Sequence, residues 1–202
     1  MTYRVSTRQL TETVAPAVEP VSLPEMKVHC RCEDTSDHDT ILYIMVKAAR
    51  QWVEREYQLS LVQRTYRADV PWFDGLYDLP LKPLSSVTSI KYYTDASPQV
   101  LTTLADTYYR ADLGRGQIYL KADSTTLPTP STRHDAVQIT YVAGHEPSTD
   151  SPQDLTANVP EAIKSTIKLL AADLFENRET NTQLKMQELK TTKMLMAPWR
   201  EY

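Results

Sequence analysis

Apolar residues recur at helical spacing along residues 37–57, a stretch without glycine or proline. Two neighbouring sets share that spacing, and together they form a wide stripe: Ile41, Met45, Ala48, Ala49 and Trp52, flanked by Leu42, Val46 and Val53. A stripe of this width suits a helix that packs against two neighbours. The pattern therefore predicts a helix of roughly 30 Å, with Trp52 and Tyr57 in the core.

The starts of two helices are readable from capping residues. Ser22 is a good N-cap, Pro24 suits the first turn, and Glu25 stands where a capping box requires it, which predicts a short helix over 22–32. Ser36 is the expected cap of the long helix. Asp37 and Asp39 then lie where the helix dipole favours negative charge.

A second amphipathic helix is predicted over 160–178, with Pro160 in its first turn. Its apolar positions repeat the helical spacing: Ile163, Ile167, Leu170 and Leu174. The two stripes are complementary, so we expect the helices of 37–57 and 160–178 to pack side by side.

Between these helices, over 59–144, the period changes to the two-residue alternation of strands. Strand-forming runs recur at Val62–Val70, Val87–Tyr93, Thr107–Arg110, Gln117–Leu120 and Val137–Val142. Leu113–Gly116 is expected to connect a hairpin. The prediction is an α+β fold: a small helical bundle with an inserted antiparallel β-subdomain and an extended C-terminal tail.

The two ends differ from the body over 22–178. Residues 1–21 lack periodicity and contain Pro16 and Pro20, which predicts an extended or flexible arm, lying on a neighbouring subunit or disordered. Residues 179–202 are apolar without clear period, and Pro198 prevents a long terminal helix. That segment either folds back onto its own domain or inserts into a partner, and we favour the partner because Met and Trp adapt to irregular surfaces.

Composition narrows the function classes. With 4 Gly among 202 residues, a phosphate-cradling loop is not expected. The net charge of −4 gives no global signature of nucleic-acid binding. No apolar run approaches the ~20 residues of a membrane span. Cys30 and Cys32 are too close for an unstrained disulfide, so reduced thiols are expected.

Candidate chemistry is sparse. His29, Cys30, Cys32 and His38 are the one cluster of soft metal donors, but no second spaced pair follows. His134–Asp135 and His145–Glu146 have no spaced nucleophile, and no Walker, dinucleotide or Gly-x-Ser-x-Gly motif occurs. We therefore expect no catalytic residue, no metal and no cofactor.

Four stretches resemble the head–tail connector (adaptor, or head-completion) proteins of tailed bacteriophages and related gene-transfer particles. They are Leu23–Lys27, Ala48–Glu54, Leu79–Tyr93, and Tyr141–His145 followed by Val159–Ile163. The Leu-Pro-x-x-Pro-Leu string at Leu79 and the strand end at Ala143–Gly144 are the parts of the resemblance that are specific to this family. The resemblance covers roughly residues 22–178.

The resemblance implies a non-enzymatic protein in the neck of the virion, which is in the host cytoplasm during assembly. Such proteins form a ring of about twelve copies under the portal, extend the DNA channel without sequence-specific binding, and meet a downstream stopper or tail protein. No membrane is involved. It also implies that the C-terminal segment docks on the portal, through residues taken here as Leu189, Met194, Leu195, Met196, Trp199, Arg200 and Tyr202.

Two other hypotheses remain. The chain could be a tail-side completion or stopper protein of the same particle. It could also be a small metal-dependent enzyme that uses His29, Cys30, Cys32 and His38.

Overall fold

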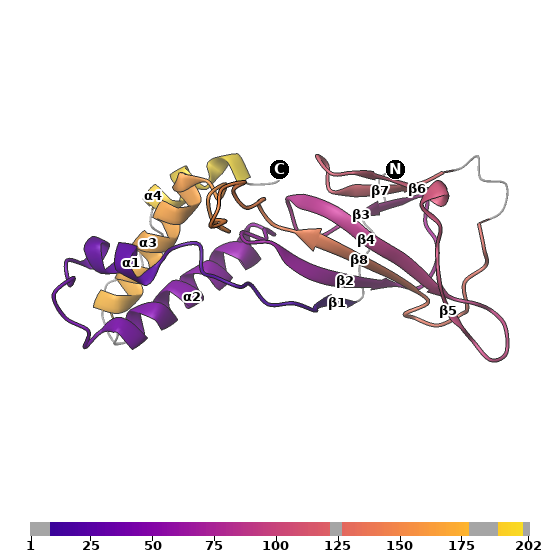
Figure 1. Cartoon of the computed structure of the whole chain (residues 1–202), viewed down its shortest axis with the longest axis horizontal. Coiled ribbons are helices and arrows are strands. Elements are labelled where there is room, and N and C mark those ends of the chain that lie inside the picture. Colours follow the sequence, from indigo (N-terminus) through magenta and orange to yellow (C-terminus); the bar gives the residue numbers. More distant parts are fainter. Residues whose placement is uncertain (1–8, 122–126, 178–189, 200–202) are drawn as a thin grey trace. The chain divides into compact units, whose positions relative to one another are not determined.

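The structure is a computed structural model that describes residues 9–121, 127–177 and 190–199. It contains helices and two antiparallel sheets, which confirms the predicted α+β class (Figure 1). The chain divides into two compact units. The β unit takes Met1–Pro16 and Gln63–Glu146, and the helical unit takes Ala17–Val62 and Pro147–Tyr202. Each unit has a hydrophobic core of its own.

The helical unit contains the three predicted helices and a short C-terminal pair. Their bounds are α1 (Leu23–Cys30), α2 (Asp39–Glu56), α3 (Glu161–Glu176), α4 (Lys190–Leu195) and the 3-10 helix η2 (Ala197–Trp199). The helices predicted over 22–32, 37–57 and 160–178 are confirmed, with ends within two residues of those expected. No helix in the described ranges combines the length and apolar character that membrane crossing needs.

The start of α1 follows the sequence signal. The Ser22 hydroxyl accepts a hydrogen bond from the Glu25 amide at 3.3 Å, and the Glu25 carboxylate accepts one from the Ser22 amide at 2.8 Å. The predicted capping box is therefore confirmed. Burial by itself would raise the pKa of Glu25, but the hydrogen bonds from Ser22, helped by the charges of Lys168 and Lys164, lower it.

The expected cap of α2 is wrong. The N-cap residue is His38, whose side chain makes no capping hydrogen bond, and Ser36 contributes its backbone carbonyl to the Asp39 amide. Electrostatics replaces the missing cap, because Asp39 lies in the first turn and pairs with Lys27 of α1 at 2.9 Å. This ion pair ties the two helix ends together.

The predicted pairing of the two long helices is confirmed. In one core, Leu42, Val46, Ala49 and Val53 of α2 meet Ile163, Ile167 and Ala171 of α3, all at most 1% exposed. Leu174 lies in the last turn of α3, beyond the buried stripe, and is 40% exposed. The α2–α3 pair is the frame of the helical unit (Figure 1).

The β unit contains two antiparallel sheets. The five-stranded sheet has the order β1 (Gln9–Glu12), β2 (Arg64–Val70), β8 (Val137–Ala143), β4 (Leu84–Tyr93) and β5 (Leu101–Thr103). The three-stranded sheet has the order β3 (Leu76–Asp78), β7 (Gln117–Leu120) and β6 (Tyr109–Asp112). Side chains of both sheets share one core, among them Tyr77, Ile118, Ile90, Ile139 and Tyr141.

Part of the predicted arm is a strand of the β unit. Residues 9–12 form β1, which pairs antiparallel with β2 in the register Leu10 to Ala68. Arg64 of β2 also lies 3.4 Å from Glu12. The expectation of an extended segment is confirmed for these residues, but the strand that they pair with belongs to their own chain.

Two stretches that carry the family resemblance meet at one point of the β unit. Leu84, at the end of the Leu-Pro-x-x-Pro-Leu string, pairs with Ala143 at the end of β8. The Gly144 amide then donates a 2.9 Å hydrogen bond to the Pro83 carbonyl. Gly144 has φ 131°, a conformation that favours glycine. The two strings are therefore one local structure rather than two independent motifs.

The hairpin predicted around Leu113–Gly116 is confirmed as the β6–β7 connection. Gly116 has φ 69°, and a Cβ placed there would approach the Lys82 side chain to 3.1 Å. The backbone conformation therefore favours glycine at this position, and a larger residue would also have to displace the Lys82 side chain slightly.

Candidate interaction surfaces

One long face of α2 is exposed although it carries large apolar side chains. Its members follow one another at helical spacing: Ile44, Lys47, Ala48, Gln51, Trp52 and Arg55. We call these six residues the outer stripe of α2. Ile44 is 54% exposed and Trp52 is 47% exposed, and Tyr43 beside them is 50% exposed. Such a row on one helix face exceeds the scattered apolar residues of an ordinary surface.

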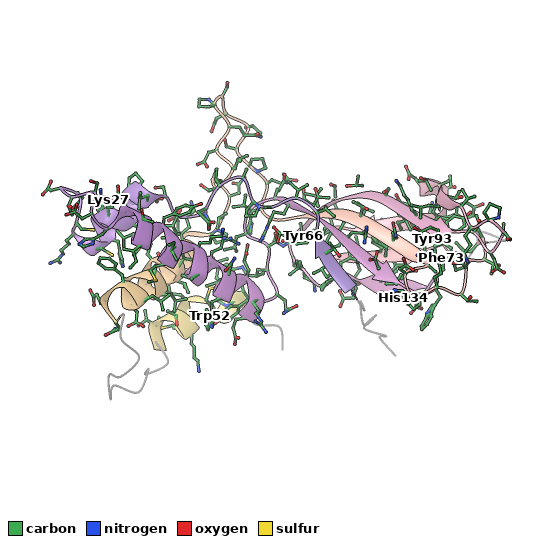
Figure 2. The ribbon with its side chains drawn as sticks, turned by 90° about the horizontal axis from the view of Figure 1, so that it is seen from below. Lys27, Trp52, Tyr66, Phe73, Tyr93 and His134 are labelled. Atoms are coloured by element: carbon green, nitrogen blue, oxygen red, sulfur yellow. The ribbon has the colours of Figure 1, made fainter. Side chains whose placement is uncertain are left out.

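Trp52 was predicted in the core, and that prediction is wrong. Its ring meets Tyr57 edge to face at 6.4 Å, on the exposed side of the helix (Figure 2). The buried stripe runs through Leu42, Val46, Ala49 and Val53, one residue away from the set that contains Trp52. One residue corresponds to a rotation of about 100° around a helix, so Ala48 and Trp52 face out, while Ile41 and Met45 at the edge of the stripe are half-buried. Tyr57 is 8% exposed, as predicted.

A buried charge network holds α2 in this rotation. Arg50 is 3% exposed; its Nε donates to Glu19 at 2.6 Å and its Nη1 donates to Glu54 at 2.5 Å. Glu54 also accepts from the Leu61 amide at 3.0 Å. Burial would lower the pKa of Arg50, but the hydrogen bond to Glu19 and the charge of Glu54 raise it.

The network joins three separate segments, namely the approach to α1, α2 itself, and the chain that leaves α2. A buried ion group of this kind is costly to break, because the remaining charge stays desolvated. The spacing of Arg50 and Glu54 is visible in the sequence as an i, i+4 pair. Glu19 has no such spacing to Arg50, so the network could not be predicted from the sequence.

The predicted portal-binding residues separate into three groups. Met194 on α4 is 78% exposed, and Leu195 is half-buried. Met196 is fully buried in the helical core, and Trp199 packs against that core. Leu189, Arg200 and Tyr202 lie outside the described residues.

The partner-inserting interpretation of the tail therefore needs correction at Met196 and Trp199. These two side chains pack on their own domain, which was the alternative to insertion into a partner. Helix α4 lies against α3, and Met196 fills space in the α2–α3 core. Of the predicted set, Met194 is the large apolar side chain that the described structure leaves open to a partner.

The β unit presents an exposed tryptophan on a well-held turn. Trp72 is 60% exposed, while its carbonyl accepts a 3.0 Å hydrogen bond from the buried Tyr77 hydroxyl. The same hydroxyl accepts from the Asp74 amide at 2.9 Å. Burial raises the pKa of Tyr77, so this hydroxyl stays protonated and can make both bonds.

The soft metal donors do not converge. Within the described ranges, no three His, Cys, Asp or Glu side chains come together as metal ligands would. Burial, followed by the charges of Cys32 and Glu176, raises the pKa of Cys30, which keeps its thiol protonated. The His38 ring lies edge to face with Phe175 at 5.3 Å. The described residues therefore contain no assembled metal site of the kind that a metal-dependent enzyme would need.

No family model matches the chain, and no curated protein matches it. Solved structures do share its fold. One chain of the virion of a native gene transfer agent (GTA) particle superposes with a TM-score of 0.75 at 23% identity, covering 96% of both chains. A chain from the neck of the empty GTA particle, computed with C6 symmetry, gives 0.74 at 23% identity over 96% of both chains.

A chain from the neck of the native GTA particle, computed with C12 symmetry, gives a TM-score of 0.67 at 22% identity, again over 96% of both chains. At these identities the likeness shows a shared fold. It extends over both the helical unit and the β unit, since almost the whole chain is covered.

Proposed function

We propose that this chain is a structural neck protein of a virus-like particle. In this proposal it is a head–tail connector that forms a symmetric ring under the portal, extends the DNA channel and links the capsid vertex to tail components. The observation that carries the proposal is the fold, shared over 96% of the chain with chains from the virion and neck of GTA particles. The connector-like strings at Leu79–Leu84 and Ala143–Gly144 also support the proposal, and they meet in one contact of the fold.

A ring of identical copies requires two different surfaces on each subunit. The outer stripe of α2 is one candidate, because Ile44 and Trp52 are exposed on a helix that its buried face fixes in place. The exposed turn at Trp72 is a second exposed aromatic surface, on the other unit. Six- and twelve-fold symmetry of the structures that contain the similar chains favours a ring of about twelve copies.

For the portal contact we propose the exposed side of α4, centred on Met194 with Leu195 beside it. Met196 is not part of this surface. It anchors the C-terminal segment, since it is buried in the helical core. Deleting the whole C-terminal segment would therefore damage the core and the docking surface together. A point substitution at Met194 separates the two effects.

The net charge of −4 suits a channel through which DNA passes. Tight binding to DNA depends on Lys and Arg that neutralise phosphates and release counterions. A ring of acidic subunits provides little of that attraction, so the proposed lumen lets DNA slide. The proposed role is structural and requires no catalytic group, and its place is the virion neck, reached from the host cytoplasm during assembly.

The test is a pull-down of the full chain against the portal protein and against the tail proteins of its own particle. Capture by the portal, weakened at least about tenfold by Met194→Asp, is the expected result. Thr191→Asp, at an exposed position of the same helix, adds the same single negative charge and is the matched control. Capture by tail proteins alone would instead favour a tail-side completion or stopper protein.

A further inference from the structure

The outer stripe of α2 carries positive charge as well as apolar surface. Lys47 and Arg55 are both exposed, and within the described ranges neither has an ion-pair partner. Arg55 lies three residues after Trp52 and therefore beside it, while Lys47 lies beside Ile44 and Gln51 on the same stripe. A partner for this surface has to bring acidic groups close to Lys47 and Arg55.

The same unit contains a matching acidic loop in front of α2. Glu33, Asp34 and Asp37 are exposed there, and none has an ion-pair partner among the described residues. Asp39, the next acidic residue, is already engaged by Lys27 at 2.9 Å. The loop therefore has three carboxylates free to meet a cationic surface, and we call residues 33–37 the acidic loop.

A chain cannot bring its own acidic loop to the Arg55 end of its own stripe. Arg55 lies near the last turn of α2, while the acidic loop precedes the first turn. The 16 residues from Asp39 to Arg55 correspond to about 24 Å at about 1.5 Å per residue. Both ends are fixed, one by the Lys27–Asp39 ion pair and the other by the Arg50 network.

We propose that the outer stripe of α2 binds the acidic loop of the next copy of the same chain. The inference rests on the proposed ring and names the contact that builds it. Two unlike surfaces on one rigid unit make a head-to-tail contact, which is the kind that can close into a ring. Trp52 and Ile44 supply the buried area at the centre, and the charges around them fix direction and register.

Charge reversal tests this contact with the full chain. The stripe-reversed chain carries Lys47→Glu and Arg55→Glu, and the loop-reversed chain carries Glu33→Lys, Asp34→Lys and Asp37→Lys. All five side chains are exposed, so both variants should fold as the unchanged chain does. Each variant alone should lose at least about tenfold in the affinity of self-association, because attraction between copies becomes repulsion.

Mixing the two variants provides the decisive step. An acidic stripe then meets a basic loop and a basic stripe meets an acidic loop, so assembly should return with the two chains alternating. Sedimentation velocity and native mass spectrometry, in solution and on the portal complex, measure both size and composition. Arg110→Glu, an exposed reversal on β6, is the matched control and should assemble like the unchanged chain.

The outcomes distinguish the contact from the ring. If the reversed variants assemble as well as the unchanged chain, or if the mixture fails to recover, the proposed contact is overturned while the ring stands. If the unchanged chain stays monomeric both in solution and on the portal, the ring itself is overturned, and the contact with it. Alternating assemblies in the mixture support both.

Discussion

The central elements of the two units, α2 and β8, use their apolar residues differently. β8 alternates strictly, so that Val137, Ile139, Tyr141 and Ala143 are buried while the residues between them are half-buried. Helix α2 has a buried stripe, but it also exposes Ile44 and Trp52 and buries Arg50. The strand buries its alternate apolar residues within its own unit. The helix keeps an apolar face that its own unit does not use, and this is the feature expected of a subunit in an assembly.

Removal of the buried arginine of α2 should have the largest effect on stability. Arg50→Ala would remove the positive charge that pairs with Glu54 and Glu19, at a cost of about 3–5 kcal/mol. Arg55→Ala on the outer stripe should change the free energy of unfolding by about 0.5 kcal/mol or less. Urea unfolding followed by far-UV circular dichroism measures both. Equal losses for the two variants would show that the network does not hold α2.

Truncation of an apolar side chain should lower stability when the side chain lies on the buried face of α2 or in β8. It should have little effect when the side chain lies on the exposed face of α2. Leu42→Ala and Ile139→Ala each remove a fully buried side chain, with an expected cost of about 2–5 kcal/mol. Ile44→Ala should cost about 0.5 kcal/mol or less in the isolated chain. The assignment of the faces fails if Ile44→Ala destabilises the chain as much as Leu42→Ala does.

The two methionines of the C-terminal segment extend the same contrast. Met196→Ala should destabilise the helical unit by about 2 kcal/mol, at the low end for a buried methionine because the segment is short. Met194→Ala should leave stability within about 0.5 kcal/mol, since that side chain is 78% exposed. Thermal unfolding of both variants checks the difference. A destabilising Met194→Ala with a neutral Met196→Ala would reverse the assignment.

The smallest effect concerns pH at the start of α1. Glu25 has a folded-state pKa below its ordinary 4.5, so its contribution is present above that value and is lost as pH falls through the folded pKa. Glu25→Gln should therefore lower stability by about 0.3–1 kcal/mol at neutral pH. The gap should close in acid, where Glu25 is protonated. Denaturant unfolding of both chains at neutral and acid pH measures it, and a gap that persists unchanged in acid would contradict the prediction.

How far the sequence predicts this structure depends on the period of each element. A period of two leaves one choice of buried face, so β7 and β8 appear where the alternation places them. In β4, two register shifts, between Leu84 and Ser86 and between Val87 and Ser89, break the alternation. In α2 two apolar sets lie one residue apart at the same spacing, and spacing alone could not choose between them. The choice is made by Arg50, which pairs with Glu54 on the same helix and with Glu19, a residue distant in the sequence. Met196 was missed for a related reason, because its place in the core depends on α3 rather than on local pattern.

The central claim is that copies of this chain form a ring in the neck of a particle. The most direct measurement is a cryo-EM reconstruction of the neck of the particle that contains this chain. The account predicts a closed ring of this chain between portal and tail, with the outer stripe of α2 in each copy covered by the next copy. A neck without this chain, or a chain present there as single copies with Trp52 facing solvent, would contradict it.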